Sequence, residues 1–312
     1  MSARRLALMA VLVALANAAS ATTADAWGLK GHTILGQAAM AHLPGGLPSF
    51  VQTDAARQEI VYLQAEEDRL KLGESDEAAW AREWTTDHYV DIGDDGMIGG
   101  AIPISALPAT RDDFDRKLEG AAHPVDPYDV GFLPYAILEG YEQVRTDFAL
   151  WRSALPGDKG ERERIAIHDI GIFSHFVGDG SQPLHVSVHY NGWGRYPNPR
   201  GFTVSKTTHA DFEGAFVDKF VSLRDVSPLV GPAQVFPAVP LADIEAYLEA
   251  TDGQLVPLYE LQKAGAFSLD DATSAAHQKG VAFAAQRLAA GSRMLDSLIL
   301  TAWQTSPGMK EE

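Results

Sequence analysis

Hydrophobic residues recur at helical spacing along most of the chain after residue 27. Apolar side chains three and four positions apart, which is the spacing of one helix face, predict helices. These segments are 30–43, 53–72, 129–154, 161–179, 208–223, 241–263 and 270–303. Alternating strand patterns are scarce, and neither an internal repeat nor a low-complexity linker interrupts the helical pattern. The pattern predicts an all-α fold, a helical bundle formed by one domain over residues 27–312.

Two long stretches between these segments lack any periodic pattern. Residues 91–108 are rich in Gly, and residues 190–207 combine Gly, Pro and Asn. Prolines also predict loops at 125–134 and 235–240. Loops as long as the first two usually carry function or cover a site. We therefore expect long irregular loops around a functional cleft.

The first 26 residues have the pattern of a targeting segment. A basic start at Arg4 and Arg5 precedes the apolar run 6–18, and Ala24-Asp25-Ala26 fits an A-x-A cleavage site. The apolar run is too short for a membrane span, which takes about 20 residues. We predict a secretory signal peptide over residues 1–26, with a membrane anchor or cleavage after Ala21 as alternatives. The mature chain would begin at Trp27, lack a transmembrane segment and be secreted or periplasmic.

Composition limits the chemistry that the chain can perform. It has 312 residues with 25 Lys and Arg, 42 Asp and Glu, 10 His and no Cys, and a formal net charge of -17. The absence of Cys excludes disulfides, thiolate metal sites and a Cys nucleophile. The acidic balance argues against a duplex-DNA binder that neutralises phosphates with Lys and Arg, although metal ions could supply the positive charge. The remaining chemistry is metal binding by His, Asp and Glu.

Two pairs of ionisable residues have the spacing of metal ligands on a helix. His175 and Asp179 are four apart, as are His209 and Glu213, so each pair shares one helix face. His185 follows the first pair, beyond the glycines and proline that end its helix. One such pair alone would more often be a solvated surface pair. Two pairs and His185 in a Cys-free chain favour a metal site.

Three further positions could complete the ligand set. Asp68 sits near a predicted helix end and His88 between polar and aromatic residues, and either alone would be an ordinary surface residue. His32 lies five residues after Trp27. A free amine on Trp27, together with its own carbonyl oxygen, would form a five-membered chelate with a metal ion. This would explain where the predicted cleavage falls.

Motifs along the whole mature chain resemble one known superfamily. WGLKGH at residue 27, HFVGDGSQPLH at residue 175 with its H-x3-D-x5-H spacing, and QRLAAGSRMLDSLILTAW near the end appear in the expected order. The sequence resembles the superfamily of zinc-dependent phospholipases C and single-strand-specific zinc nucleases. The resemblance implies a mostly α-helical bundle with a trinuclear zinc cluster at the bottom of a cleft. It also implies a hydrolase acting on phosphoric ester bonds.

The resemblance implies a ligand set for each of the three Zn²⁺ ions. One ion would be held by Asp68, His88, His175 and Asp179. A second would be held by the amine and carbonyl of Trp27, by His32 and by Asp179 as a bridge. The third would be held by His185, His209 and Glu213.

The resemblance also implies catalytic roles for two carboxylates. A hydroxide bridging two zinc ions would attack the phosphodiester. Asp179 would set the spacing of that pair, and Asp68 would act as a base toward the attacking water. His42, His123 and His277 need no metal role. We expect His168, seven residues before His175, to support the site or lie in the core, and His189 either to have no functional role or to touch substrate.

The sequence leaves the substrate open between two phosphodiesters. Glu213 matches the phospholipases, whereas the short WGLKGH spacing matches the nucleases. Arg69, beside Asp68, would repel a choline head group. Four aromatic residues of the 190–207 loop could stack a nucleobase, cradle a choline, contact a lipid surface or simply pack on one another: Tyr190, Trp193, Tyr196 and Phe202.

We therefore predict a secreted zinc phosphodiesterase. The first reading is a phospholipase C that cleaves the glycerol-phosphate ester of phospholipids and makes transient contact with a membrane surface. The alternative is a single-strand-specific endonuclease or 3′-nucleotidase, with single-stranded nucleic acid as substrate. A third reading is a non-catalytic zinc-binding helical protein. We expect a monomer.

Overall fold

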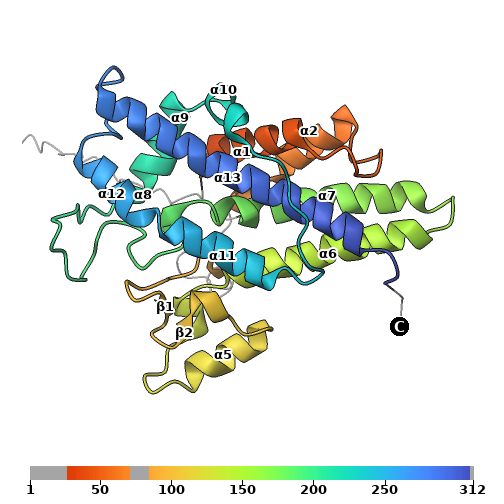
Figure 1. Cartoon of the computed structure of the whole chain (residues 1–312), viewed down its shortest axis with the longest axis horizontal. Coiled ribbons are helices and arrows are strands. Elements are labelled where there is room, and N and C mark those ends of the chain that lie inside the picture. Colours follow the sequence, from red (N-terminus) through yellow and green to blue (C-terminus); the bar gives the residue numbers. More distant parts are fainter. Residues whose placement is uncertain (1–26, 71–83, 310–312) are drawn as a thin grey trace, which may run out of the picture.

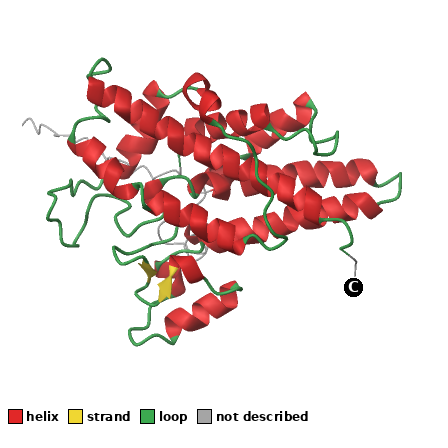
Figure 2. Cartoon of the chain, viewed as in Figure 1, coloured by secondary structure: helices red, strands yellow, loops and turns green. Residues whose placement is uncertain are grey.

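A computed structural model describes residues 27–70 and 84–309. The signal peptide predicted for residues 1–26 lies outside the described residues. Helices dominate the described chain, and Figures 1 and 2 show them as a bundle elongated in one direction. The predicted all-α fold is confirmed. No helix of the described segments combines the length and apolar character needed to cross a membrane.

The helices follow the predicted segments with a few differences. The helices are α1 (Gly28–His42), α2 (Asp54–Leu63), α3 (Glu66–Leu70), α5 (Arg111–Glu119), α6 (Leu133–Ser153), α7 (Lys159–Asp179), α8 (Thr208–Ala210), α9 (Val217–Phe220), α10 (Leu223–Val226), α11 (Leu241–Asp252), α12 (Leu255–Lys263) and α13 (Ala275–Thr305). A π-helical turn, Asp211–Phe216, joins α8 to α9. The 3₁₀ turns are Thr86–His88, Ile104–Ala106, Pro127–Asp129, Pro183–His185 and Ser227–Leu229.

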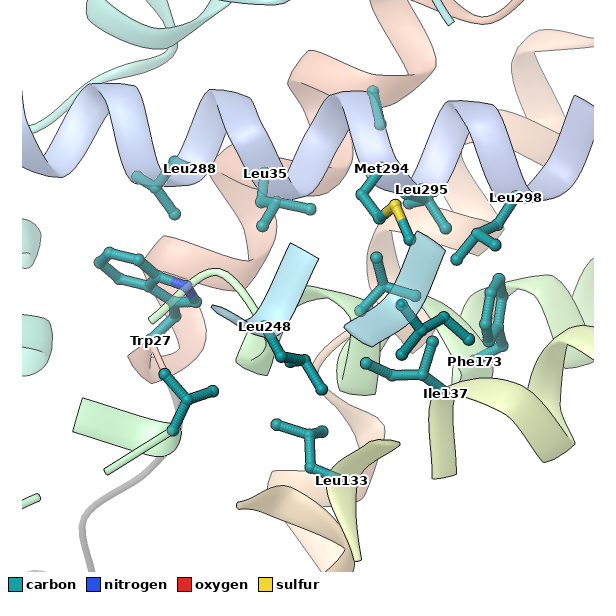
Figure 3. Close-up of a cluster of buried hydrophobic side chains, with 14 of the residues drawn as sticks. Trp27, Leu35, Leu133, Ile137, Phe173, Leu248, Leu288, Met294, Leu295 and Leu298 are labelled. Atoms are coloured by element: carbon teal, nitrogen blue, oxygen red, sulfur yellow. The ribbon is translucent and has the colours of Figure 1, made fainter. Parts of the chain in front are cut away.

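The long helix α13 forms the centre of the bundle. It packs against α1, α6 and α7, and α6 and α7 run side by side as a helical hairpin. Leucines on the buried face of α13, among them Leu288, Leu295 and Leu298, meet Leu35 of α1 and Phe173 of α7 in one apolar cluster (Figure 3). Burial of these side chains, each worth about 1.5–3 kcal/mol, holds the four helices together.

Besides the segment 208–223, which the π-helical turn divides, two of the predicted helices are interrupted in the structure. The segment 53–72 divides into α2 and α3, because Gln64 ends α2 and turns its carbonyl oxygen toward His175 Nδ1 at 2.8 Å. The segment 241–263 divides at Gly253 into α11 and α12. In both cases the apolar spacing continues across the break, so periodicity alone could not reveal it.

The predicted loop at 91–108 contains a small β-hairpin. Strands β1 (Met97–Ile98) and β2 (Ile102–Pro103) pair antiparallel, with Ile98 opposite Ile102. The following helix α5 was not predicted, because only Phe114 and Leu118 are buried in its highly charged sequence. The loop at 190–207 is irregular, as predicted, apart from one isolated bridge between Tyr190 and Gly192.

Candidate metal centre

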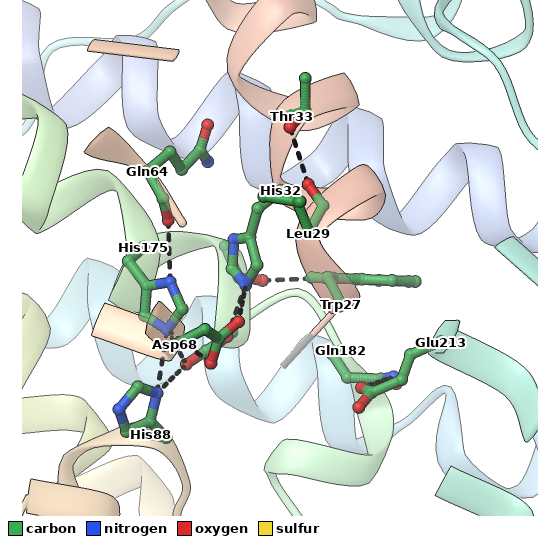
Figure 4. A network of polar contacts seen from close by, with 12 residues as sticks. Trp27, Leu29, His32, Thr33, Gln64, Asp68, His88, His175, Gln182 and Glu213 are labelled. Carbon is green, nitrogen blue, oxygen red and sulfur yellow. Dashed lines mark hydrogen bonds and ion pairs between the residues drawn. The ribbon is translucent and has the colours of Figure 1, made fainter. Parts of the chain in front are cut away.

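Five predicted ligands from four different parts of the chain form one buried group. These are His32 of α1, Asp68 of α3, His88 of a 3₁₀ turn, and His175 and Asp179 of α7. The ligand atoms of His32, His175 and Asp179 lie within 4.8 Å of one another, as do those of Asp68, His88 and His175. Figure 4 shows the side chains of His32, Asp68, His88 and His175 pointing toward one another. We call these five residues the first group.

The first group has distances that suit shared coordination. Asp179 Oδ1 lies 3.3 Å from His32 Nε2, and Asp179 Oδ2 lies 3.3 Å from His175 Nε2. His88 Nδ1 lies 2.9 Å from His175 Nε2. Two ligand atoms of one tetrahedral zinc ion are separated by about 3.3 Å when each bond is about 2.0 Å long. Asp179 directs one oxygen toward each of two histidines, the arrangement expected of a bridging carboxylate.

The remaining three predicted side-chain ligands form a second group beside the first. His209 Nε2 lies 3.0 Å from His185 Nε2 and 2.8 Å from Glu213 Oε2. All three side chains are buried. His185 Nδ1 also lies 4.0 Å from Asp179 Oδ2, so the two groups adjoin each other through Asp179. We call His185, His209 and Glu213 the second group.

A π-helical turn carries the second group's carboxylate. Glu213 lies within the turn Asp211–Phe216, directly after the single helical turn α8 that holds His209. π-helical turns are rare in proteins, and those that occur are often found at functional sites. The predicted i, i+4 pairing nevertheless holds, since the two side chains meet.

Backbone carbonyl groups orient two of the histidines. His175 Nδ1 lies 2.8 Å from the Gln64 carbonyl oxygen, and His185 Nδ1 lies 2.6 Å from the His88 carbonyl oxygen. Each Nδ1–H donates to its carbonyl, which directs Nε2 of the ring toward the carboxylates. Metal-ligating histidines are held in the same way by a hydrogen bond from the second ring nitrogen.

Electrostatics link the carboxylates to the imidazoles. Burial alone would raise the pKa of Asp179, but the His175 and His185 rings outweigh it and hold that pKa well below its ordinary value. Burial likewise opposes ionisation of Glu213, yet His209 and His185 lower its pKa. Burial lowers the pKa of His32, which favours the neutral ring that a metal ion needs. Ionised carboxylates and a neutral imidazole are the protonation states that bind zinc.

Several buried polar atoms at this centre lack a hydrogen-bond partner among the described residues. They are both ring nitrogens of His32, Asp179 Oδ1, His209 Nδ1 and Glu213 Oε1, since the 3.3 Å ion-pair contact of His32 Nε2 with Asp179 Oδ1 lacks hydrogen-bond geometry. A buried polar atom without a partner costs about 1–3 kcal/mol, so several of them in one place need an explanation. A metal ion would satisfy those atoms that face it. Nitrogen and oxygen donors without sulfur fit zinc. The residues present therefore fit the zinc ions that the resemblance implies.

Trp27 lies to the right of His32 and above Glu213 in the view of Figure 4. Its indole Nε1 donates to the Gly178 carbonyl oxygen at 3.0 Å and to Ser181 Oγ at 2.8 Å, and the side chain is fully buried. Its φ of 36° makes it the one non-glycine residue with positive φ in the described part of the chain. The indole contacts place residue 27 at the centre. Coordination by its amine and carbonyl remains a prediction.

Sequence reasoning missed the residues that support the ligands. Gln64 orients His175 as described above, and its own amide donates to the Ser174 carbonyl oxygen. Gln182 donates from Nε2 to Glu213 Oε2 at 3.0 Å. Gln182 lies inside the HFVGDGSQPLH motif and could have been suspected, whereas Gln64 has no comparable signal. 

The expectation for His168 was wrong. Its side chain is 56% exposed and pairs with Asp169, because this part of α7 lies away from the ligand cluster and presents that position to solvent. It neither supports the site nor lies in the core.

His189 connects the 190–207 loop to the 91–108 loop through contacts with Trp193 and Asp94. Its ring stacks on Trp193 at 3.8 Å, Nδ1 lies 3.0 Å from the Trp193 carbonyl oxygen, and Nε2 lies 2.9 Å from Asp94 Oδ1. Both ring nitrogens are therefore occupied within the protein. Of the loop aromatics, Trp193 and Phe202 are buried in this packing, whereas Tyr190 and Tyr196 are exposed.

The Arg69 side chain contacts residues that lie close to it in sequence. Its guanidinium pairs with Glu66 at 2.8 Å and lies 4.2 Å from the centre of the Tyr62 ring. Arg69 is thus next to Asp68 in sequence, but its guanidinium forms its ion pair with Glu66.

Fold and site together define an all-α protein with a buried histidine and carboxylate centre whose donor atoms suit divalent metal ions. No family model and no curated protein matches the chain. Among solved structures, the chain is similar to Clostridium perfringens alpha-toxin isolated from avian strain SWCP, with a TM-score of 0.44 and 13% identity over 93% of this chain and 67% of that one. It is also similar to the alpha toxin of Clostridium absonum, with a TM-score of 0.40 and 11% identity over 89% of this chain and 64% of that one. The proposed function therefore rests on the site itself.

Proposed function

We propose that this protein is a secreted zinc-dependent phosphodiesterase whose first substrate class is phospholipid, cleaved as by a phospholipase C. The observation that carries this proposal is the convergence of three carboxylates and five histidines in two adjoining buried groups, linked by the 4.0 Å approach of Asp179 to His185. A phosphodiester is anionic and has a poor leaving group, so a cluster of cations is the chemistry that its hydrolysis needs. The proposed domain is the mature chain from Trp27 onward.

Zinc, when bound, supplies positive charge for the phosphate oxygens and makes hydroxide available near neutral pH. The side chains and backbone of the protein would hold the ions and accept a proton. Asp68, His88, His175 and Asp179 would hold one ion, His32, the Trp27 backbone and Asp179 would hold the second, and the second group would hold the third. Asp68 is the proposed proton acceptor, since its carboxylate lies 3.7 Å from His175 Nε2 and 3.8 Å from His32 Nε2, at the edge of both sets.

The choice of lipid over nucleic acid rests on residues and charge. Glu213 matches the phospholipase pattern, and a net charge of -17 gives no long-range attraction for a polynucleotide. The alternative, a single-strand-specific nuclease or 3′-nucleotidase, is favoured by the short Trp27-to-His32 spacing. The exposed Tyr190 and Tyr196 offer a stacking surface for either substrate.

The direct test measures metal content and two activities on the mature protein. We expect about three zinc ions per chain, release of phosphocholine or another phosphorylated head group from phospholipid vesicles, and no cleavage of single-stranded DNA. Chelation should abolish the activity and added zinc should restore it. Glu213→Gln should lose one zinc ion and most activity, while Glu161→Gln, a change to an exposed carboxylate on α7, should lose neither.

Each other result has a defined meaning. Nucleolysis without lipid cleavage would replace the first reading by the nuclease. A full zinc complement with neither activity would favour the non-catalytic zinc-binding protein. A zinc content near zero in gently purified protein would contradict the whole proposal.

The role of the Trp27 amine has its own test. One alanine placed before Trp27 in the mature protein converts the amine into an amide, which is a far poorer ligand. We expect zinc content to fall and activity to drop on the order of ten- to a hundredfold. The control is mature protein that begins at Trp27 itself. Equal zinc content and equal activity in the two forms would exclude Trp27 as a ligand.

A further inference from the structure

A cleft lies between α11 and α13, and none of its lining residues is a predicted metal ligand. Its volume is about 660 Å³, within the range of about 300–1,000 Å³ that is usual for small-molecule sites. The extended segment 229–236 closes one side. Its lining residues include Phe236, Tyr247, Ala250, Arg287, Arg293 and Met294.

Short side chains keep this cleft open. Ala246 and Ala250 of α11 line it opposite Ala289 and Ala290 of α13, and methyl groups cannot fill the space between the two helices. Phe236 and Met294 add apolar surface. The cleft is thus lined by both apolar and polar side chains, and it has room for a chain of several carbon atoms.

Two arginines of α13 line the same cleft without a carboxylate partner. The structure assigns neither Arg287 nor Arg293 an ion pair with any described residue, and Arg287 Nε is buried with no hydrogen-bond partner. This is unusual in so acidic a chain, where Arg111 and Arg116, for example, pair with aspartates. The buried Nε–H of Arg287 lacks an acceptor, and the less buried ends of the two guanidinium groups remain available to hydrogen-bond a bound anion.

The other polar groups of the cleft do not satisfy this arginine. The Tyr247 hydroxyl is already used, since it donates to the Val177 carbonyl oxygen at 2.7 Å. Asp243 is the one carboxylate among the lining residues, and it pairs with neither arginine within the described chain. The cleft therefore presents unsatisfied guanidinium donors beside apolar surface.

We propose that this cleft binds a small amphipathic anion, with its acidic group on Arg287 and a short apolar portion on Phe236 and Met294. Arg293, whose guanidinium Nη1 lies about 3.8 Å from where a Cβ on Gly231 would stand, contributes a second positive charge at the rim. The bidentate geometry of guanidinium suits a carboxylate or a phosphate equally. The site is separate from the zinc proposal, because none of its lining residues is a proposed ligand.

Calorimetric titration of the zinc-loaded protein tests the proposal with four probes. Octyl phosphate and octanoate differ in the acidic group, inorganic phosphate lacks the apolar part, and octyltrimethylammonium reverses the charge. We expect octyl phosphate or octanoate to bind at least about tenfold more tightly than inorganic phosphate, and the cation not to bind. The stronger of the two acids identifies the preferred head group.

Variants separate this cleft from the metal centre, which would also attract phosphate. Arg287→Gln should weaken binding of the preferred acid at least about tenfold, a loss of about 1.4 kcal/mol. Arg224→Gln, a change to an exposed arginine on α10 outside the cleft, should leave binding unchanged. Ala250→Phe should also abolish binding by filling the cleft from an exposed position, without touching an arginine.

The result that would overturn the proposal is equally specific. Binding that survives unchanged in Ala250→Phe or in Arg287→Gln would place the anion elsewhere. Equal affinity for octyltrimethylammonium, or no binding of either acid to the wild-type protein, would also exclude it. Zinc content and phosphodiesterase activity play no part in this readout, so it fails or succeeds independently of the proposed function.

Discussion

At the scale of single residues, the absence of a side chain at Gly178 leaves the space that the His32 ring occupies. A Cβ on Gly178 of α7 would stand 3.0 Å from His32 Nδ1 and 3.1 Å from its Cε1. The His32 ring and the α7 backbone at Gly178 are both buried, so neither could move aside easily to make room for a Cβ. Gly178 therefore allows α1 and α7 to approach closely enough for His32 to reach Asp179.

The corresponding prediction is that Gly178→Ala displaces His32. We expect the variant to lose about one zinc ion and on the order of ten- to a hundredfold in activity, because a ligand moves away from its partners. Gly160→Ala on the same helix is the matched control, since its Cβ would meet no atom within 4 Å. That control should keep its zinc and gain up to about 1 kcal/mol of stability. Metal analysis and activity of the two variants check the prediction, and full zinc content in Gly178→Ala would contradict it.

At the scale of elements, α13 combines a long buried face with one buried acid. Asp296 is only 1% exposed, its Oδ1 has no hydrogen-bond partner within the described residues, and burial raises its pKa well above the ordinary value. The folded protein thus keeps this carboxyl protonated at pH values where the unfolded chain has released the proton. Stability should be greatest below the unfolded pKa, near 4, and fall as the pH rises toward the folded pKa.

Asp296→Asn removes this pH dependence. We expect the variant to match the wild type near pH 4 and to become increasingly more stable than it as the pH rises, by up to about 1.4 kcal/mol per pH unit. Denaturant unfolding of zinc-loaded wild type, Asp296→Asn and Asp158→Asn, a change to an exposed acid, between pH 4 and 8 measures this difference. A constant offset between wild type and Asp296→Asn across that range would refute a raised pKa.

The elements also show where sequence patterns reach their limit. The period of 3.6 residues predicted α1, α6, α7 and α13 because each has a continuous apolar face in the core. It did not reveal the break at Gln64, whose carbonyl oxygen bonds to a histidine 111 positions away. It also missed α5, where charges outnumber the two buried residues.

At the scale of the whole molecule, the metal centre joins elements from the beginning, middle and second half of the chain. His32, His175 and Glu213 belong to α1, α7 and the π-helical turn, so ions bound there would tie these elements together. Anything that binds the folded but not the unfolded chain stabilises it, by about 2.7 kcal/mol at a free concentration a hundred times Kd. A chain without Cys has no disulfides to do the same.

Removal of metal should therefore lower the melting temperature. We expect a chelator to reduce Tm by at least about 5 °C, since each kcal/mol shifts Tm by about 2–4 °C in a protein of this size class. Re-addition of zinc should restore Tm, and re-addition of magnesium, which prefers oxygen ligands, should not. Differential scanning calorimetry makes the measurement. An unchanged Tm after verified metal removal would show that the centre does not contribute to stability.

Local sequence patterns were enough to predict the helical class and to name the candidate ligands. Apolar periodicity is a local property, and i, i+4 pairs such as His175 with Asp179 share a face of any helix that contains them. Which of the candidate ligands meet depends on the folded chain, because the approach of His32, Asp68 and His88 to that pair requires separate elements to pack together. The same packing exposed His168, occupied both nitrogens of His189, and left Arg287 Nε in a cleft without a hydrogen-bond partner among the described residues. None of these outcomes is encoded within a window of neighbouring residues, since each depends on contacts between distant parts of the chain.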